Sequence, residues 1–530
     1  MRRARAFAPG ILAAVFGVVA LVAWAFASPV GATPDEDFHL TSVWCGQGYQ
    51  EGFCERGSGP GERLVPLELL LAPQCYAFHP TESAACQEGF SPDPELVSSD
   101  RGNFSGEYPP VFYWVMNLFA GRGIVRSVLL MRIFNALLAV ALVGAVAVLS
   151  PPGVRRAVVT SAVVTAVPLG MFLLPSVNPS GWGLVGALCF TPALVGYLVT
   201  EGRRRWALAG LAAVSLLVGA GARFDAALFA ALGAVVAVTV GWKAGRRHLT
   251  DLVVPVLLGA VALVTFLSSG ASAAGQTDDV AKDLSVGHLF RLLGDVPSLW
   301  IGTVTGSGWG LGWLDTAMPA VVPVIVWGVL AGAVFSALPS GDRRHQLALL
   351  AVGAALWLVP TYMQVVTGYD VGAWVQPRYI QPLVVMLVAL ALLRVRGAVG
   401  WRRVQWLLVV VGLSIANSIA LFTTLRRFVT GNDVGGIDLD RQREWWWPGP
   451  IGPVAVWIVG SLAFAVAAAL LLRSMRADVP ESSVSLSAAD PSSPDGGATL
   501  SGGSDGATSG VAASSSHPAV DAGQHQGPAV

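Results

Sequence analysis

Residues 9–39 read PGILAAVFGVVALVAWAFASPVGATPDEDFH, and this stretch decides the kind of fold that the chain can adopt. Its first part, from about Pro9 to Val30, is almost entirely apolar and long enough to cross roughly 30 Å of hydrocarbon as a helix. Directly after it come three carboxylates and an imidazole, those of Asp35, Glu36, Asp37 and His39. Charged groups are costly to hold near hydrocarbon and are often functional there. The stretch therefore predicts a membrane helix that ends at a polar site.

The composition extends this expectation to the whole chain. Of its 530 residues, 54% are hydrophobic and only 12% are charged, with a net charge of zero. Soluble domains carry about 25% charged residues, so the chain is expected to be a polytopic membrane protein. It has no Walker A pattern, which argues against a self-powered pump, and no HExxH or paired CxxC pattern. No basic patch with interleaved aromatic residues points to nucleic acid.

Apolar segments of spanning length recur along the chain. They lie near 9–29, 127–149, 157–175, 182–200, 206–222, 225–241, 251–269, 317–338, 346–366, 379–393, 404–424 and 452–472. Basic residues precede the first segment and follow every second one, in short connections such as Arg203 to Arg205. By the positive-inside rule, these connections and both termini face the cytoplasm. The expected fold is an all-α protein of about twelve transmembrane helices in a bacterial cytoplasmic membrane.

The large connections then face outward. The first runs over about 30–126 and the second over about 270–316, with a surface helix expected at His288 to Trp300. Tyr108 to Phe119 is apolar and aromatic but too short to span, and we expect an interfacial helix there. The polytopic domain covers 1–476, and the Ser- and Gly-rich remainder, 477–530, is expected to be a disordered cytoplasmic tail.

Four of the five cysteines lie in the first outward connection, at Cys45, Cys54, Cys75 and Cys86. An even number of clustered cysteines in an oxidising compartment predicts two disulfides, and the sequence leaves all three pairings open. Free thiols are the alternative.

The acidic cluster is the first candidate site. A carboxylate at a membrane mouth, Asp35 or Asp37, could deprotonate a hydroxyl as it attacks a sugar carbon. Asp35 and Glu36 could instead hold a divalent cation such as Mg²⁺ or Mn²⁺. The structural alternative is a solvated acidic turn that enforces topology, and His39 could merely hydrogen-bond within the loop.

Two other segments could bind a substrate. Arg378 begins a span on the outer side, where it could hold a phosphate or merely extend its charge to the interface. The segment Gly308–Thr316, GWGLGWLDT, carries Trp313, which could stack on a sugar, and Asp315, which could orient a hydroxyl. For the tryptophans an interfacial aromatic belt is the alternative. Arg223 and Asp225 are expected to pair across a short outer turn.

Together these motifs resemble a bacterial family of multi-pass membrane proteins catalogued as domain of unknown function 2142. The resemblance runs from about Pro29 to Leu472. It rests on Pro34-Asp35-Glu36 with His39, Tyr108-Pro109-Pro110, Asn178-Pro179, Gly312 to Thr316, and Arg378-Tyr379. That family in turn resembles the GT-C class of glycosyltransferases, which take sugars from polyprenyl phosphates and carry the catalytic carboxylate in the first outer loop. The departures are Pro377 in place of an expected Gly, the third carboxylate Asp37, and the four-cysteine insertion.

By this resemblance, Asp35 is the expected base, Glu36 supports it or binds a cation, and Arg378 contacts the lipid phosphate. The expected substrate-binding residues are His39, Tyr108, Asn178, Trp313, Asp315, Arg378 and Tyr379. The implied function is transfer of a sugar from a polyprenyl-phosphate donor to an envelope glycan, lipid or protein outside the cell. The rivals are a transporter or flippase of lipid-linked saccharides and a non-catalytic envelope scaffold. A transporter should show internal repeats and charges near mid-membrane, and neither is evident.

Overall fold

The computed structural model describes residues 2–91, 94–242, 248–268, 285–306, 310–338, 342–372, 375–394 and 401–477. Residues 1–479 form one compact unit. The predicted tail lies outside the described residues from 478 onward. So do residues 269–284 of the second outward connection, Gly308 and Trp309, and the basic residues Lys243, Arg246, Arg247 and Arg396.

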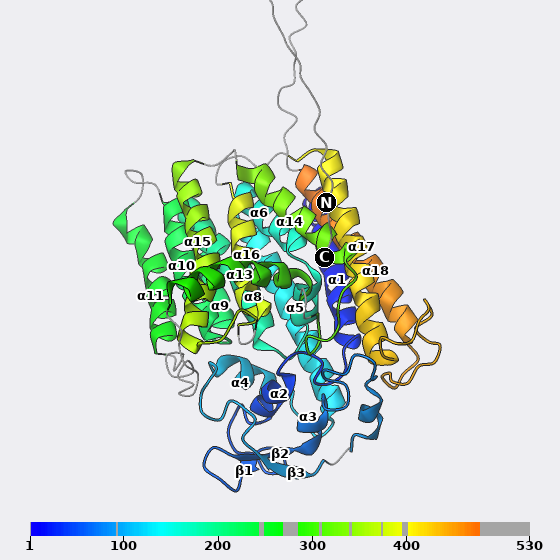
Figure 1. The fold of residues 1–530 in the computed structure, drawn as a ribbon. Coiled ribbons are helices and arrows are strands. Elements are labelled where there is room, and N and C mark those ends of the chain that lie inside the picture. Colours follow the sequence, from blue (N-terminus) through cyan, green and yellow to red (C-terminus); the bar gives the residue numbers. More distant parts are fainter. Residues whose placement is uncertain are drawn as a thin grey trace, which may run out of the picture. The chain divides into compact units, whose positions relative to one another are not determined.

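Long apolar helices make up most of this unit and stand side by side in Figure 1. Among the described residues, eight helices are long and apolar enough to cross a membrane. They are α1 (Arg2–Phe26), α5 (Ile124–Leu149), α8 (Pro179–Val199), α10 (Phe224–Gly241), η2 with α11 (Leu249–Leu252 and Val253–Leu267), α15 (Arg343–Thr367), α17 (Arg403–Val429) and α18 (Pro453–Ala477). Each coincides with a segment predicted to span.

The other four predicted segments are also helical but do not meet those criteria. Segment 157–175 is divided into α6 (Pro152–Val164) and α7 (Pro168–Leu173), because Pro168 lacks the N–H that would continue the helix. The other three are α9 (Gly202–Ala220), which begins with three arginines, and the shorter helices α14 (Val321–Ala337) and α16 (Pro377–Leu392). The structure thus establishes a mostly helical protein with eight candidate spans in its described part, and the count of twelve stays a prediction.

The basic connections gather at one end of the bundle. Arg204 donates to the carbonyl oxygens at the end of α5, and Arg205 forms an ion pair with Asp251 at the start of η2. Arg344 donates to the carbonyl oxygen of Trp242, just after α10. These contacts agree with the alternation read from the sequence.

α8 lies at the centre of the helix packing. In its most apolar window 83% of the residues are buried, against 17% for η2 with α11. Gly186 of α8 lies against Gly219 of α9, where an added Cβ would meet the facing Cα at 2.8 Å. Small residues allow this close approach, as is common between membrane helices.

The first outward connection folds into a small region of its own, drawn below the bundle in Figure 1. It contains α2 (Glu36–Trp44), α3 (Leu67–Leu71), η1 (Ala85–Gly89), α4 (Val111–Asn117) and the strands β1 (Glu55–Arg56), β2 (Arg63–Pro66) and β3 (Leu96–Ser99). The strands form an antiparallel sheet in the order β1-β2-β3, with Arg63 opposite Ser99. The all-α prediction missed this sheet, because its strands are too short to produce an alternating pattern.

Two disulfides stabilise this region, Cys45–Cys54 and Cys75–Cys86. The prediction of two disulfides is thereby confirmed, and the structure selects one of the three open pairings. Each bridge closes a short loop, of 9 and 11 residues in sequence separation. The fifth cysteine, Cys189, is free and buried in α8.

Both predicted surface helices are present with shifted bounds. α4 covers only seven residues of the segment 108–119, since Pro110 is its N-cap. The second, α13 (Val286–Thr305), is longer than predicted and packs against α14, α15 and α16. Figure 1 draws it across the direction of the long helices.

Candidate functional site

The acidic cluster lies in the turn between α1 and α2. Asp35 is the residue before α2 and adopts a left-handed conformation with φ 61°. Aspartate and asparagine tolerate this region better than most residues. The Thr33 N–H donates to Glu36 Oε2 at 3.0 Å and the Glu36 N–H to the Thr33 carbonyl oxygen at 3.0 Å. This closed turn gives each carboxylate a fixed direction.

Asp35 points to two arginines from distant parts of the chain. Its Oδ2 lies 2.6 Å from Arg378 at the start of α16, and its Oδ1 lies 3.5 Å from Arg101. Burial by itself would raise the pKa of Asp35, but the charges of Arg378 and Arg101 outweigh it and lower the pKa. The side chain stays 39% exposed. Asp35 is therefore an ionised, accessible carboxylate.

Asp37 has a different environment. The Arg101 guanidinium donates to both of its oxygens, at 2.6 and 3.0 Å. Such a bidentate pair is among the strongest hydrogen-bonded contacts that a carboxylate makes. The Asp37 side chain is only 12% exposed. The geometry therefore favours Asp35 over Asp37 as a base, a choice that spacing could not make.

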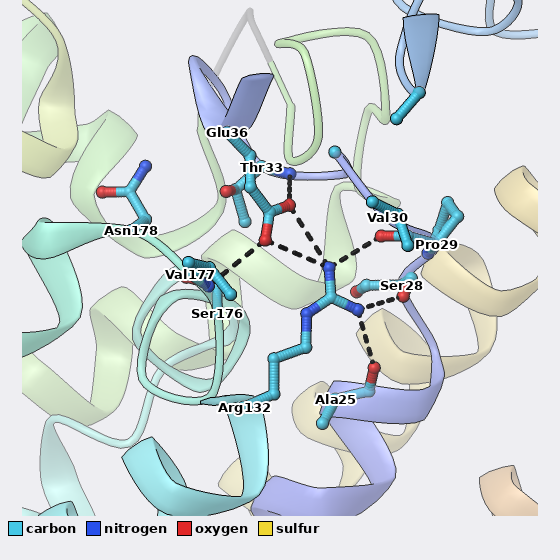
Figure 2. A network of polar contacts seen from close by, with 12 residues as sticks. Ala25, Ser28, Pro29, Val30, Thr33, Glu36, Arg132, Ser176, Val177 and Asn178 are labelled. Carbon is cyan, nitrogen blue, oxygen red and sulfur yellow. Dashed lines mark hydrogen bonds and ion pairs between the residues drawn. The ribbon is translucent and has the colours of Figure 1, made fainter. Parts of the chain in front are cut away.

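Glu36 is buried completely and paired with Arg132 of α5 (Figure 2). Arg132 Nη2 lies 3.2 Å from each carboxylate oxygen, and the Val177 N–H donates to Oε1 at 3.2 Å. Together with the Thr33 N–H, these donors form hydrogen bonds to both carboxylate oxygens of Glu36. Glu36 therefore joins α2 to α5 and to the segment before α8, and it is a positioning residue.

The sequence analysis did not identify Arg132 as part of this site. Its guanidinium also donates to the carbonyl oxygens at the end of α1 and just after it, those of Ala25, Ser28 and Pro29. A single arginine within an apolar span was the signal for it. The residue holds the end of α1 and the acidic turn in one arrangement.

His39 lies behind Asp35, on the next turn of α2. Its Nδ1 is 3.0 Å from the Tyr113 hydroxyl of α4, and its ring meets the ring of Tyr108 edge-on at 5.3 Å. Burial lowers the pKa of His39 to about 3; the negative charge of Asp35 opposes this shift, and Arg378, Arg223 and Arg101 add to it. The imidazole is therefore neutral at physiological pH and packs within the aromatic cluster.

Tyr379 and Tyr108 lie near two arginines at the end of the bundle where α10 and α16 begin. Arg378 donates to the Tyr379 hydroxyl at 3.2 Å, and the Arg223 guanidinium lies over the Tyr379 ring at 4.5 Å and the Tyr108 ring at 5.7 Å. The predicted pair of Arg223 with Asp225 is present, at 2.6 Å. The structure thus brings together Asp35, Arg378, Tyr379, Tyr108 and His39.

Asn178 supports the acidic turn from the side. Its side chain accepts from the Ser180 N–H at 2.9 Å, as the N-cap of α8, and donates to the Pro34 carbonyl oxygen at 3.0 Å. This amide is therefore committed to holding Pro34, next to Asp35. We assign it a positioning role.

Trp313 and Asp315 lie in a turn that contacts the first outward connection. The Trp313 indole donates to the Gly31 carbonyl oxygen at 2.8 Å. Asp315 Oδ2 accepts from Arg427 of α17 at 2.7 Å and from the Phe78 N–H at 3.1 Å. Both side chains are buried and hydrogen-bonded to other parts of the protein, which favours a structural role for them. Their turn nevertheless lines a cavity of about 20 Å³ beside Pro34 and Arg378.

The donor set does not suit a resident cation at Asp35 and Glu36. Arginines already neutralise both carboxylates. Across the described part of the chain, no three His, Cys, Asp or Glu side chains gather as a metal site would require. The divalent cation stays a prediction, and we derive no step through it.

No curated protein and no solved structure matches the chain. A family model does match, over residues 18–387, which include every candidate site residue from Asp35 to Tyr379. The match ends before the predicted limit of the resemblance at Leu472. On this match the chain belongs to the family described as "Predicted membrane protein (DUF2142)".

Proposed function

We propose that the protein is a membrane glycosyltransferase of the GT-C type. It takes a sugar from a polyprenyl-phosphate donor and transfers it to an envelope glycan, lipid or protein on the outer side. In this proposal the chain crosses a bacterial cytoplasmic membrane twelve times, with both termini in the cytoplasm. The observation that carries the proposal is the contact of Asp35 with Arg378 at 2.6 Å, at the outer end of the bundle.

This pair supplies the two groups that such a transfer needs. An acceptor hydroxyl attacks the anomeric carbon of the donor as the bond from that carbon to the phosphate oxygen breaks. Asp35 accepts the hydroxyl proton, and the phosphate leaves with the bonding electrons as polyprenyl phosphate. Arg378 stabilises the charge that develops on the leaving phosphate. A single in-line attack of this kind inverts the anomeric centre.

The resting contact also suggests how the base is activated. When Arg378 binds the donor phosphate, Asp35 loses the partner that most strongly lowers its pKa. Burial then raises the pKa of Asp35 toward the range where a carboxylate is an effective base. Arg101 remains close to the carboxylate and keeps it oriented.

The positions of the charges favour transfer over transport. A transporter of lipid-linked saccharides should place ionisable residues at its central binding site. Here Asp35, Arg378 and Arg223 gather where helices begin or end, at the starts of α2, α16 and α10. A non-catalytic scaffold would have no use for an accessible carboxylate beside a buried arginine.

The proposal is tested in a deletion strain that carries the wild type, Asp35→Asn or Asp37→Asn at equal membrane levels. Asparagine keeps the size of Asp35 and its left-handed backbone, so a loss of activity would report the missing base. We expect Asp35→Asn to lose about 10²- to 10⁴-fold in rate and fail to restore the missing envelope glycan. Asp37→Asn should retain activity. Full restoration by Asp35→Asn would overturn the assignment.

A further inference from the structure

An apolar cavity of about 770 Å³ lies inside the helix bundle. It is lined mostly by apolar residues of α1, α5, α6, α7, α8, α16 and α18, together with two arginines, Arg155 of α6 and Arg204 of α9. Ligand pockets commonly have about 300–1,000 Å³. Its lining includes Ile11 of α1 and Val148 of α5, whose side chains are 65% and 54% exposed. Since these two helices are candidate spans, the cavity opens toward the lipid.

Among the residues that the structure describes, one amide side chain in this lining has no hydrogen-bond partner. Gln381 of α16 is 2% exposed, and neither its amide nitrogen nor its amide oxygen makes a hydrogen bond. A buried amide without a partner costs free energy. Its presence in an apolar wall points to a polar group that reaches it from the cavity.

Gln381 and Arg378 lie on one face of α16. They are three residues apart in the helix, about 4.5 Å along its axis. Val385 follows on the same face and also lines the cavity. A lipid that followed this face would have its phosphate at Arg378, its first atoms at Gln381 and its chain in the cavity.

The break between α6 and α7 lies beside this path. Non-helical backbone at membrane depth is tolerated where it lines a cavity, and Thr165 and Ala166 of the break line this one. Gly170 of α7 faces Gln381, where an added Cβ would lie 3.4 Å from the amide nitrogen. The absence of a side chain at Gly170 leaves room next to the amide. Other residues of α7, such as Leu173, face the small cavity beside Arg378.

We propose that the cavity holds the hydrocarbon chain of the donor lipid, and that Gln381 donates to an oxygen of its phosphate ester. This assignment rests on the proposed function for the identity of the lipid. It explains why the cavity, the lateral opening and the unpartnered amide occur together. It also assigns a chain-length preference to the enzyme, because a short chain cannot fill the space.

Gly144 allows a direct test. It lies in α5, lines the cavity and has open space where a Cβ would be added, so Gly144→Phe fills the cavity without disturbing the backbone. Gly353 of α15 also has open space and does not line the cavity, so Gly353→Phe is the matched control. Binding of undecaprenyl phosphate, geranyl phosphate and phosphatidic acid to the purified full chain would be measured by native mass spectrometry.

We expect Gly144→Phe to bind undecaprenyl phosphate at least tenfold more weakly than the wild type. Its binding of geranyl phosphate should be unchanged, and Gly353→Phe should match the wild type in both. Gln381→Leu should weaken binding of both isoprenoid phosphates and raise the thermal stability of the unliganded protein, because it removes the unpartnered amide. Equal binding of undecaprenyl phosphate by Gly144→Phe and the wild type would overturn the proposal. Equally tight, cavity-dependent binding of phosphatidic acid would overturn the assignment to the donor.

These measurements use no acceptor and no transfer reaction, so they separate the two proposals. If Gly144→Phe loses the long-chain lipid while Asp35→Asn restores the glycan, the cavity assignment stands and the transferase fails. If Asp35→Asn is inactive and Gly144→Phe binds undecaprenyl phosphate as the wild type does, the transferase proposal stands and the cavity assignment fails.

Discussion

At the scale of single residues, three consecutive carboxylates have three different environments. Asp35 is accessible and contacts two arginines, and Glu36 is buried against Arg132. Asp37 accepts two hydrogen bonds from the Arg101 guanidinium. The left-handed backbone at Asp35 separates the directions in which they point. Neighbours in sequence can therefore have unrelated roles.

We expect Glu36→Gln to destabilise the protein much more than Asp35→Asn does. The substitution leaves the charge of Arg132 buried without a counter-charge, and breaking a buried ion pair costs about 3–5 kcal/mol. Asp35→Asn removes only a partly exposed contact. Thermal unfolding of the purified variants measures the difference. Equal melting temperatures for the two variants would contradict the positioning role of Glu36.

His39 predicts a pH dependence of stability. Its pKa is about 3 in the folded protein, well below the usual 6.5, so below pH 6.5 the unfolded chain takes up a proton that the folded protein excludes. Stability is therefore complete above pH 6.5 and falls by up to about 1.4 kcal/mol per pH unit on acidification. His39→Gln should lose less stability than the wild type between pH 7 and 5. Parallel losses in both proteins would show that His39 is not the group responsible.

The sequence could identify these residues but could not rank them. From the alternation of spans and basic connections, the sequence predicted that Asp35 and Arg378 lie at the same end of the bundle, and the structure brings them into contact. Their contact joins residues 343 positions apart, and no local pattern encodes such a distance. The sequence also gave no sign that Glu36 is buried. A single arginine in an apolar span, Arg132, was nevertheless a signal for the residue that pairs with it.

At the scale of elements, β3 delivers Arg101 to the acidic turn. The strand ends at Ser99, two residues before the arginine that contacts both Asp37 and Asp35. The sheet that the sequence analysis missed thus has a direct connection to the candidate site.

We expect Arg101→Gln to move the acid limb of the pH profile of kcat/KM to higher pH. Arg101 contributes to the lowered pKa of Asp35, so its removal lets protonation of the base begin at higher pH. Asp37→Asn is the control, because it keeps the arginine charge. The profile would be measured with membranes that contain each variant. An acid limb unchanged in Arg101→Gln would mean that Arg101 does not influence the base.

The observed element bounds differ from the predicted ones where backbone chemistry competes with hydropathy. The segment 157–175 is apolar throughout its centre, yet Pro168 starts a new helix within it. The disulfide pairing also needed the structure, since four cysteines in one loop allow three connectivities.

At the scale of the whole molecule, basic connections that are far apart in the sequence contact neighbouring helix ends. In the described part of the chain, eight of the predicted segments are helices long and apolar enough to span, and the basic connections meet at one end. At the other end Arg427 of α17 pairs with Asp315 and donates to the Tyr76 and Glu82 carbonyl oxygens of the first outward connection. That contact ties the start and the end of the membrane unit together.

The most direct test of the account follows the lipid-linked sugar itself. Membrane vesicles from the deletion strain, with either the wild type or Asp35→Asn, would be mixed with the acceptor fraction of the envelope, and polyprenyl-phosphate sugars would be quantified over time. The account predicts that wild-type vesicles consume one such sugar and release polyprenyl phosphate, while Asp35→Asn vesicles retain it. Consumption at the same rate in both would contradict the account.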